Sequence, residues 1–133
     1  DSLRVALQAY AKADLQLYQN KKEEALQLFL AILQKHKGES IEEGTLFKVG
    51  KIYEEKGDFN KALTYYQNIL DNHKDGIYKD EALYFSAEIY RKHLLDNEKA
   101  KALYEKVVLE HPDSLYYTES RKQYRTLRGD STI

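Results

Sequence analysis

The chain has 133 residues, of which 42% are hydrophobic and 32% charged, so it has enough apolar residues for a core and is not expected to be disordered as a whole. Lys and Arg number 21 against 22 Asp and Glu, so the net charge gives no indication of binding to nucleic acid or to an anionic membrane. The absence of cysteine excludes disulfides, thiolate metal sites and cysteine nucleophiles, and no apolar run approaches the roughly 18 residues of a membrane span.

The sequence begins at Asp1, contains no methionine and has no signal-peptide core at its start. We therefore expect a processed or excised piece of a longer protein. A targeting segment would then belong to the missing part.

Apolar residues recur with helical spacing, and no segment alternates with a period of two for long enough to form a strand, which predicts an all-α protein. Ser40 and Glu43 fit a capping box at the start of the third helix. Asp113-Ser114 opens a last helix, which Gly129 stops. The predicted helices, in chain order, are residues 2–19, 21–37, 40–56, 59–73, 78–94, 97–110 and 114–128.

Three segments, residues 20–36, 57–73 and 95–111, align with one another at spacings of 37 and 38 residues. A fixed period in this range is typical of stacked repeats, which usually present a surface to partners. Equivalent positions carry similar residues: Ala25, Ala62 and Ala100; Phe29, Tyr66 and Tyr104; Ile32, Ile69 and Val107; His36, His73 and His111.

The small and aromatic residues of these segments resemble the pattern of the tetratricopeptide repeat (TPR) family over about residues 5–112. The middle repeat carries Gly50, Tyr53, Gly57, Ala62 and Tyr66; the third carries Ala87, Tyr90, Ala100, Tyr104 and Pro112; the first carries Ala13, Ala25 and Phe29. The resemblance implies one domain over residues 1–128, a right-handed α-α superhelix of three helix-turn-helix units. The units would be about 5–38, 42–76 and 79–112, followed by a capping helix at 114–128 and a tail at 129–133.

A finer resemblance is to TPR proteins of the Gram-negative cell envelope, such as outer-membrane assembly lipoproteins and Tol–Pal-associated proteins. It is carried by residues 43–58, 78–90 and 111–114 and by the closing helix with Arg128-Gly129-Asp130. It implies a periplasmic or outer-membrane-associated location, with the cytoplasm not excluded, and membrane attachment only through a missing N-terminal anchor. It also implies that the last helix covers the open end of the repeats with Tyr117, Ser120, Tyr124 and Leu127.

In this family the first helices of successive repeats line a concave groove, and the resemblance transfers the groove positions to eleven residues. An alternative is that Tyr10, Phe47 and Tyr84, which are repeat-equivalent, are core residues. The clamp that some co-chaperones use for a C-terminal carboxylate is absent, because Asp14 and Glu88 stand at clamp positions. The predicted groove residues are Tyr10, Asp14, Leu17, Phe47, Lys48, Lys51, Glu54, Tyr84, Phe85, Glu88 and Arg91.

No pattern indicates a catalytic, metal or cofactor site. Three of the four histidines are one repeat apart, too far to share an ion whose ligands lie about 2 Å from it. The acidic pairs, such as Glu23-Glu24, point in different directions on their helices, and there is no phosphate-binding Gly loop. The basic cluster Arg121, Lys122, Arg125 and Arg128 fits a complement to the helix dipole, with an anionic ligand as the alternative.

The sequence thus predicts a non-catalytic scaffold that binds a protein or peptide in the groove, without nucleic acid, small-molecule substrate or cofactor. Self-association, or stacking on further repeats through the first helix, is the first alternative. An all-helical hydrolase is the second.

Overall fold

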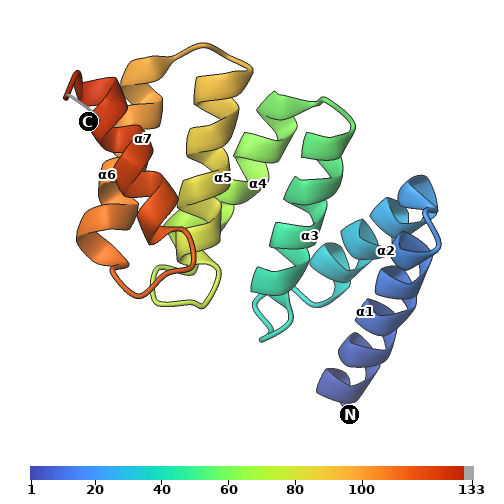
Figure 1. The fold of residues 1–133 in the computed structure, drawn as a ribbon. Helices are drawn as coiled ribbons and strands as arrows, with labels where there is room; N and C mark the ends of the chain where they lie inside the picture. Colours follow the sequence, from blue (N-terminus) through green and yellow to red (C-terminus); the bar gives the residue numbers. More distant parts are fainter. Residues whose placement is uncertain (131–133) are drawn as a thin grey trace. The chain divides into compact units, whose positions relative to one another are not determined.

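The computed structural model describes residues 1–130, and these form seven α-helices and no strand (Figure 1). This confirms the predicted all-α repeat architecture, and every helix end lies within three residues of its predicted position. No helix in the described range is both long and apolar enough to cross a membrane. The helices are α1 (Ser2–Tyr18), α2 (Lys22–Lys35), α3 (Glu42–Glu55), α4 (Phe59–Asn72), α5 (Lys79–Lys92), α6 (Asn97–Glu110) and α7 (Tyr117–Arg128).

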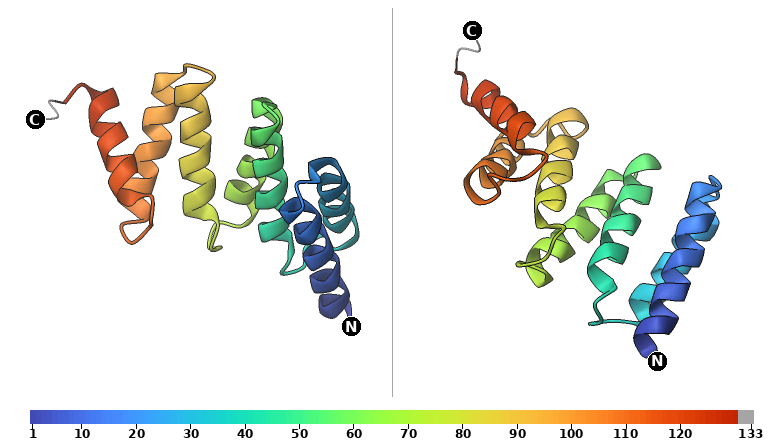
Figure 2. Two further views of the ribbon diagram at one scale, coloured as in Figure 1. Left: turned by 45° about the vertical axis from the view of Figure 1, so that its right-hand side comes forward. Right: turned by 60° about the horizontal axis from the view of Figure 1, so that its bottom comes forward.

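The chain divides into two compact units, Asp1–Ile69 and Leu70–Ile133. The first holds α1, α2, α3 and most of α4, and the second holds the end of α4 with α5, α6 and α7. Within the units, α1 packs against α2, α5 against α6, and α6 against α7, each pair as an antiparallel hairpin (Figure 2).

Small residues bring the helices of the first unit close together. Ala13 on α1 and Ala25 on α2 are fully buried in a cluster with Phe29, Val49 and Ile52. On α3, Gly50 makes room for the ring of Tyr66, because a Cβ on Gly50 would lie 2.5 Å from Tyr66 Cε1. Burying this much apolar surface is the main source of stability for such hairpins.

The core of the second unit is built on Ala87, Ala100 and Tyr104, all fully buried. Tyr124 and Leu127 of α7 pack against this core, and Ser120 of the same helix is fully buried. These three residues cover the last repeat as predicted, and Tyr117 is half-buried.

The turn between the two helices of each repeat contains one residue with a left-handed backbone. Asn20, Gly57 and Leu95 fill this position with φ values of 63°, 81° and 53°. Glycine adopts this conformation at little cost and asparagine tolerates it, whereas leucine does not. The third repeat has one extra turn residue and places its leucine there.

At two helix starts the capping differs from the prediction. The capping box at Ser40 does not form: α3 begins at Glu42 with Ile41 at the cap position, and the Glu42 carboxylate accepts from the backbone N–H of Gly38 at 3.1 Å. The last helix begins at Tyr117, because Ser114 closes the preceding turn instead. The Ser114 hydroxyl accepts from the Tyr116 N–H at 3.0 Å and donates to Asp80 Oδ2 at 2.6 Å.

Candidate partner-binding surface

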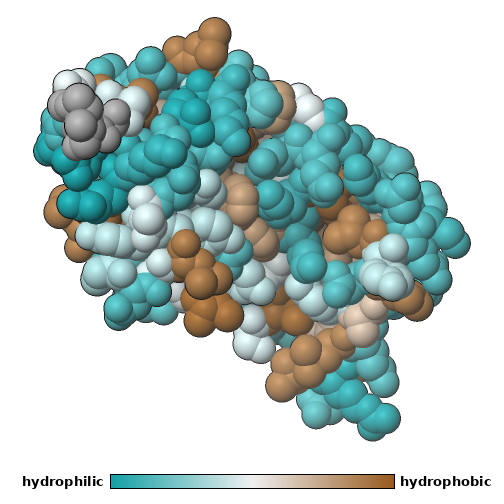
Figure 3. Space-filling view, viewed as in Figure 1, coloured by the Kyte–Doolittle hydropathy of each residue, from teal (hydrophilic) through white to brown (hydrophobic). Residues whose placement is uncertain are grey.

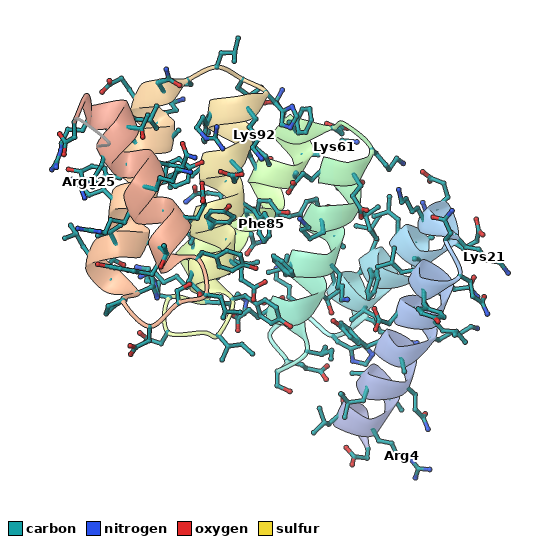
Figure 4. The ribbon with its side chains drawn as sticks, viewed as in Figure 1. Arg4, Lys21, Lys61, Phe85, Lys92 and Arg125 are labelled. Atoms are coloured by element: carbon teal, nitrogen blue, oxygen red, sulfur yellow. The ribbon has the colours of Figure 1, made fainter. Side chains whose placement is uncertain are left out.

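The eleven predicted groove residues lie on the first helices of the repeats, some in the first unit and some in the second. The second unit contributes four residues from α5, and the first unit contributes seven from α1 and α3. Phe85 is labelled on α5 in Figure 4. Those in the first unit are Tyr10, Asp14, Leu17, Phe47, Lys48, Lys51 and Glu54; those in the second are Tyr84, Phe85, Glu88 and Arg91.

In the first unit, charged groups of the predicted set contact one another. Lys48 Nζ on α3 lies 3.0 Å from Asp14 Oδ1 on α1, so this pair links the first helices of two repeats. Lys51 Nζ lies 3.7 Å from Glu54 Oε1, and the hydroxyl of Tyr66 donates to the same carboxylate oxygen at 2.7 Å. The Lys48 and Lys51 side chains each keep 30% of their surface exposed, so both remain accessible to a partner.

The apolar residues of the set in the first unit belong largely to the core. The ring of Tyr10 packs edge-on against Phe29 with centroids 5.4 Å apart, and Leu17 packs against the same buried cluster. Phe47 lies 6.0 Å from the ring of Tyr66. These ring contacts support the interpretation of Tyr10 and Phe47 as core residues, although both are only half-buried.

In the second unit, Glu88 is nearly buried, at 9% exposure, and collects three donors. Arg91 Nη2 lies 3.0 Å from Oε2, Lys92 Nζ lies 2.8 Å from Oε1, and the hydroxyl of Tyr104 donates to Oε2. Arg91 Nε also donates to the Tyr104 oxygen at 2.9 Å. Burial by itself raises the pKa of the Glu88 carboxyl, but the hydrogen bonds from Lys92, Tyr104 and Arg91 outweigh it and hold the pKa below its ordinary value.

The two units use the same positions with opposite charges. Lys51 and Glu54 correspond, one repeat later, to Glu88 and Arg91. Tyr66 donates to Glu54, whereas Tyr104 bonds to both Glu88 and Arg91. In the first repeat, Asp14 matches Lys51, but Leu17 and Phe29 stand at the positions of Glu54 and Tyr66, so this repeat lacks the hydroxyl and one of the two charges. A tyrosine hydroxyl of the second helix therefore holds a carboxylate of the first helix in the middle and third repeats.

Tyr84, Phe85 and Tyr116 form an aromatic cluster in the second unit. Tyr84 stacks on Tyr116 with centroids 4.5 Å apart and planes inclined by 19°, while Phe85 meets Tyr116 edge-on at 5.5 Å and Tyr84 at 5.4 Å. Sequence reasoning missed Tyr116, which precedes α7. Its repeat equivalence to Tyr78, 38 residues earlier, was the available signal.

The histidines lie at helix ends. His36, His93 and His111 occupy the C-cap positions of α2, α5 and α6. His36 Nδ1 lies 3.0 Å from Glu39 Oε2, and that carboxylate also accepts from the Ser2 hydroxyl at 2.9 Å. No group of three potential ligands that could hold a metal occurs among residues 1–130.

The basic cluster of α7 is partly paired. Arg125 Nε lies 3.7 Å from Asp130 Oδ2, and Arg128 pairs with the same carboxylate. Arg128 also lies over the ring of Tyr124 at 4.9 Å. These contacts connect Asp130, which follows the last helix, to the arginines of its final turn.

Comparisons with known proteins agree with this geometry. Residues 45–76 and 81–114 match the family model described as tetratricopeptide repeat. Among solved structures, a tetratricopeptide repeat protein from Parabacteroides merdae ATCC 43184 is similar, with a TM-score of 0.74 and 22% sequence identity. The similarity covers 93% of this chain and 46% of the other, so the chain spans about half the length of that protein. No curated protein matches the sequence.

Proposed function

Since the chain belongs to the tetratricopeptide repeat family, we propose that it is a non-catalytic scaffold that binds a peptide or a segment of a partner protein on the first-helix face of its repeats. Repeats of this family generally act in protein–protein interaction. The observation that carries the proposal is the match of two successive helical hairpins to the family, together with the similar solved structure.

The geometry of the first unit supports a surface that is ordered before a partner arrives. Lys48 is held by Asp14 across two helices, and Lys51 is held near Glu54, whose carboxylate Tyr66 fixes in turn. Binding to such a preformed surface avoids much of the entropic cost of ordering side chains. The partner in this proposal is a protein, with no nucleic acid, small-molecule substrate or cofactor involved.

Charge reversal tests the proposal. Partners would be captured by cross-linking in extracts of the source organism, identified, purified and titrated against the wild-type chain and the Lys48→Glu/Lys51→Glu variant. We expect the variant to bind at least tenfold more weakly. A matched control is Lys35→Glu/Lys37→Glu, which makes the same charge change at exposed positions at the end of α2. Equal affinity of both variants and the wild type would show that this face is not the binding face.

A location in the bacterial cell envelope is part of the proposal, and it rests on the resemblance of residues 43–58, 78–90 and 111–114. The full reading frame tests it. A signal peptide or lipobox upstream of Asp1 would support the proposal, and fractionation of the protein with the cytoplasm would refute it.

Self-association, or stacking on further repeats, is the second candidate, and the surface of α1 favours it. Leu3, Val5, Leu7 and Leu15 are each about half exposed, at 47%, 48%, 50% and 53%, and Tyr18 is 89% exposed. Brown, apolar surface lies over the lower part of α1 in Figure 3. Sedimentation velocity distinguishes the two candidates: self-association through α1 should disappear in the Leu3→Ser/Leu7→Ser variant, whereas partner binding on the first-helix face should persist.

A further inference from the structure

The aromatic cluster of the second unit, defined by Tyr84, Phe85 and Tyr116, combines ring faces with negative charge. All three rings are half-buried, so each keeps part of its surface in contact with solvent. The rings come from two segments, α5 and the turn before α7, and their contacts of 4.5 to 5.5 Å hold them as one patch.

Carboxylates surround the patch. Burial, together with the charges of Glu88 and Glu119, raises the pKa of the Tyr84 hydroxyl to about 12, while the charge of Arg91 acts in the opposite direction. Burial likewise raises the pKa of the Tyr116 hydroxyl, and the charges of Glu81 and Asp80 add to the effect. Three acidic side chains of α5 and one of α7 thus lie close enough to influence the two tyrosines.

Two of these carboxylates, Asp80 and Glu119, form no ion pair with a basic side chain among residues 1–130. Asp80 accepts from the hydroxyl of Ser114 at 2.6 Å, and Glu119 accepts from the side-chain amide of Gln123 at 2.7 Å. Both donors are neutral, so each hydrogen bond orients the carboxylate without cancelling its charge. Glu88 differs, because Arg91 and Lys92 pair with it.

We propose that the cluster of Tyr84, Phe85 and Tyr116 binds a cationic side chain, preferably an arginine, from the partner segment. The inference rests on the proposed scaffold function and names the chemistry of the partner at this point. Aromatic faces attract a cation through the ring quadrupole, and a guanidinium can stack flat on a ring while it pairs with a nearby carboxylate. Asp80 and Glu119 would supply that pairing and would repel an acidic partner.

A minimal peptide tests the inference without knowledge of the natural partner. The probe is N-acetyl-Ala-Arg-Ala-amide, titrated into the isotopically labelled 133-residue chain and followed by the backbone amide signals in two-dimensional NMR. The reference probe carries citrulline, which has nearly the shape of arginine but no charge. We expect the arginine peptide to shift the amides of Tyr84, Phe85 and Tyr116, with a Kd on the order of 1 mM. We expect the citrulline peptide to bind at least fivefold more weakly.

Conservative variants test the assigned groups. Asp80→Asn and Glu119→Gln retain the ability to accept from Ser114 and Gln123 but lose their charge, so each should weaken arginine binding several-fold. Phe85→Leu should also weaken it, because it keeps the apolar volume and removes the ring. The matched control is Glu98→Gln, which removes a charge from an exposed carboxylate on α6 and should leave binding unchanged.

Three results would overturn the inference: equal binding of the arginine and citrulline peptides, absence of shifts at the three cluster residues, or unchanged affinity in both Asp80→Asn and Glu119→Gln. Failure here differs from failure of the scaffold proposal. A partner that is lost on charge reversal at Lys48 and Lys51 supports the scaffold proposal even if this cluster binds no arginine.

Discussion

The hydroxyl of Tyr66 on α4 donates to the carboxylate of Glu54 on α3 at 2.7 Å, and this bond joins the two helices of the middle repeat. Tyr66 is fully buried, whereas the Glu54 side chain keeps 21% of its surface exposed. The buried tyrosine therefore fixes the Glu54 carboxylate, which lies 3.7 Å from the partly exposed Lys51 ammonium group.

Removing this hydroxyl should destabilise the first unit. A hydrogen bond to a charged group contributes about 1.5–3 kcal/mol, and partial exposure of Glu54 lets water replace some of it. We expect Tyr66→Phe to lower the free energy of unfolding by about 1 kcal/mol in urea denaturation. Tyr65→Phe, a half-buried neighbour on the same helix, is the control and should lose less. Equal losses would show that the bond to Glu54 adds nothing to stability.

The Glu88 carboxyl should make stability depend on pH. Its pKa in the folded protein lies below the ordinary value of 4.5, so its stabilising effect is complete well above pH 4.5 and is lost as the pH falls through the folded pKa. We expect Glu88→Gln to lower the free energy of unfolding by about 1–2 kcal/mol at pH 7.

The difference in unfolding free energy between Glu88→Gln and the wild type should shrink below pH 4.5. Urea denaturation at pH 7, 5 and 3 would measure it. A constant difference over this range would show that the titration of Glu88 is not coupled to folding.

A methyl group at position 50 should collide with Tyr66. The Cβ would lie 2.5 Å from Cε1 of a ring that is fully buried and tied to Glu54. Overpacking costs about 1–3 kcal/mol, and the better helix propensity of alanine offsets about 1 kcal/mol. We expect Gly50→Ala to destabilise the protein by about 1 kcal/mol in thermal or urea unfolding. In a Tyr66→Leu background the same change should instead be neutral or stabilising; a destabilisation of the same size in both backgrounds would exclude the ring as its cause.

The turn before α6 should tolerate glycine better than its own leucine. Leu95 has φ = 53° and is 78% exposed. Its left-handed backbone is therefore strained, and little side-chain burial offsets that strain. That conformation costs a leucine about 1–2 kcal/mol, part of which glycine loses again through its freedom in the unfolded chain. We expect Leu95→Gly to raise the free energy of unfolding by about 0.5–1 kcal/mol. Gly57→Ala, at the equivalent turn, should act in the opposite direction. A destabilised Leu95→Gly would contradict the assigned strain.

The hydroxyl of Ser120 on the capping helix should be dispensable. Its oxygen is buried and has no hydrogen-bond partner within the described part of the chain, and the repeat-equivalent residue is Ala82. An unsatisfied buried hydroxyl costs about 1–3 kcal/mol, so Ser120→Ala should raise the melting temperature by a few degrees.

Thr45 occupies the same repeat position in α3, but its Oγ1 donates to the Ile41 carbonyl at 2.8 Å. Thr45→Val should therefore lower the melting temperature. Calorimetry of both variants gives the comparison, and a lower melting temperature for Ser120→Ala would mean that its hydroxyl has a role in the folded state.

The sequence was sufficient for the repeats and helices because these depend on local periodicity. The spacing of Ala25, Ala62 and Ala100 indicated where the second helices pack, and all three are fully buried. Helix starts were less predictable. Ser40 has the right residue type for a cap, but the turn before α3 uses the Glu42 carboxylate and the Gly38 N–H instead.

The candidate surface was less accessible to sequence reasoning. Repeat equivalence located the first-helix residues, but it could not show that a tyrosine of the second helix bonds to Glu54 in one repeat and to Glu88 and Arg91 in the next. Nor could it show that Tyr116 stacks on Tyr84, because that contact joins residues 32 positions apart through a turn whose path the sequence does not specify.

By itself, the sequence determined the helical hairpins, their number and their family, because helix formation and small-residue packing are encoded by residues a few positions apart. Only the tertiary structure decided which polar side chains bond to one another within the protein and which remain accessible to a partner. Hydrogen bonds and ring contacts form between side chains on different helices, and their geometry is set by the packing of the whole unit.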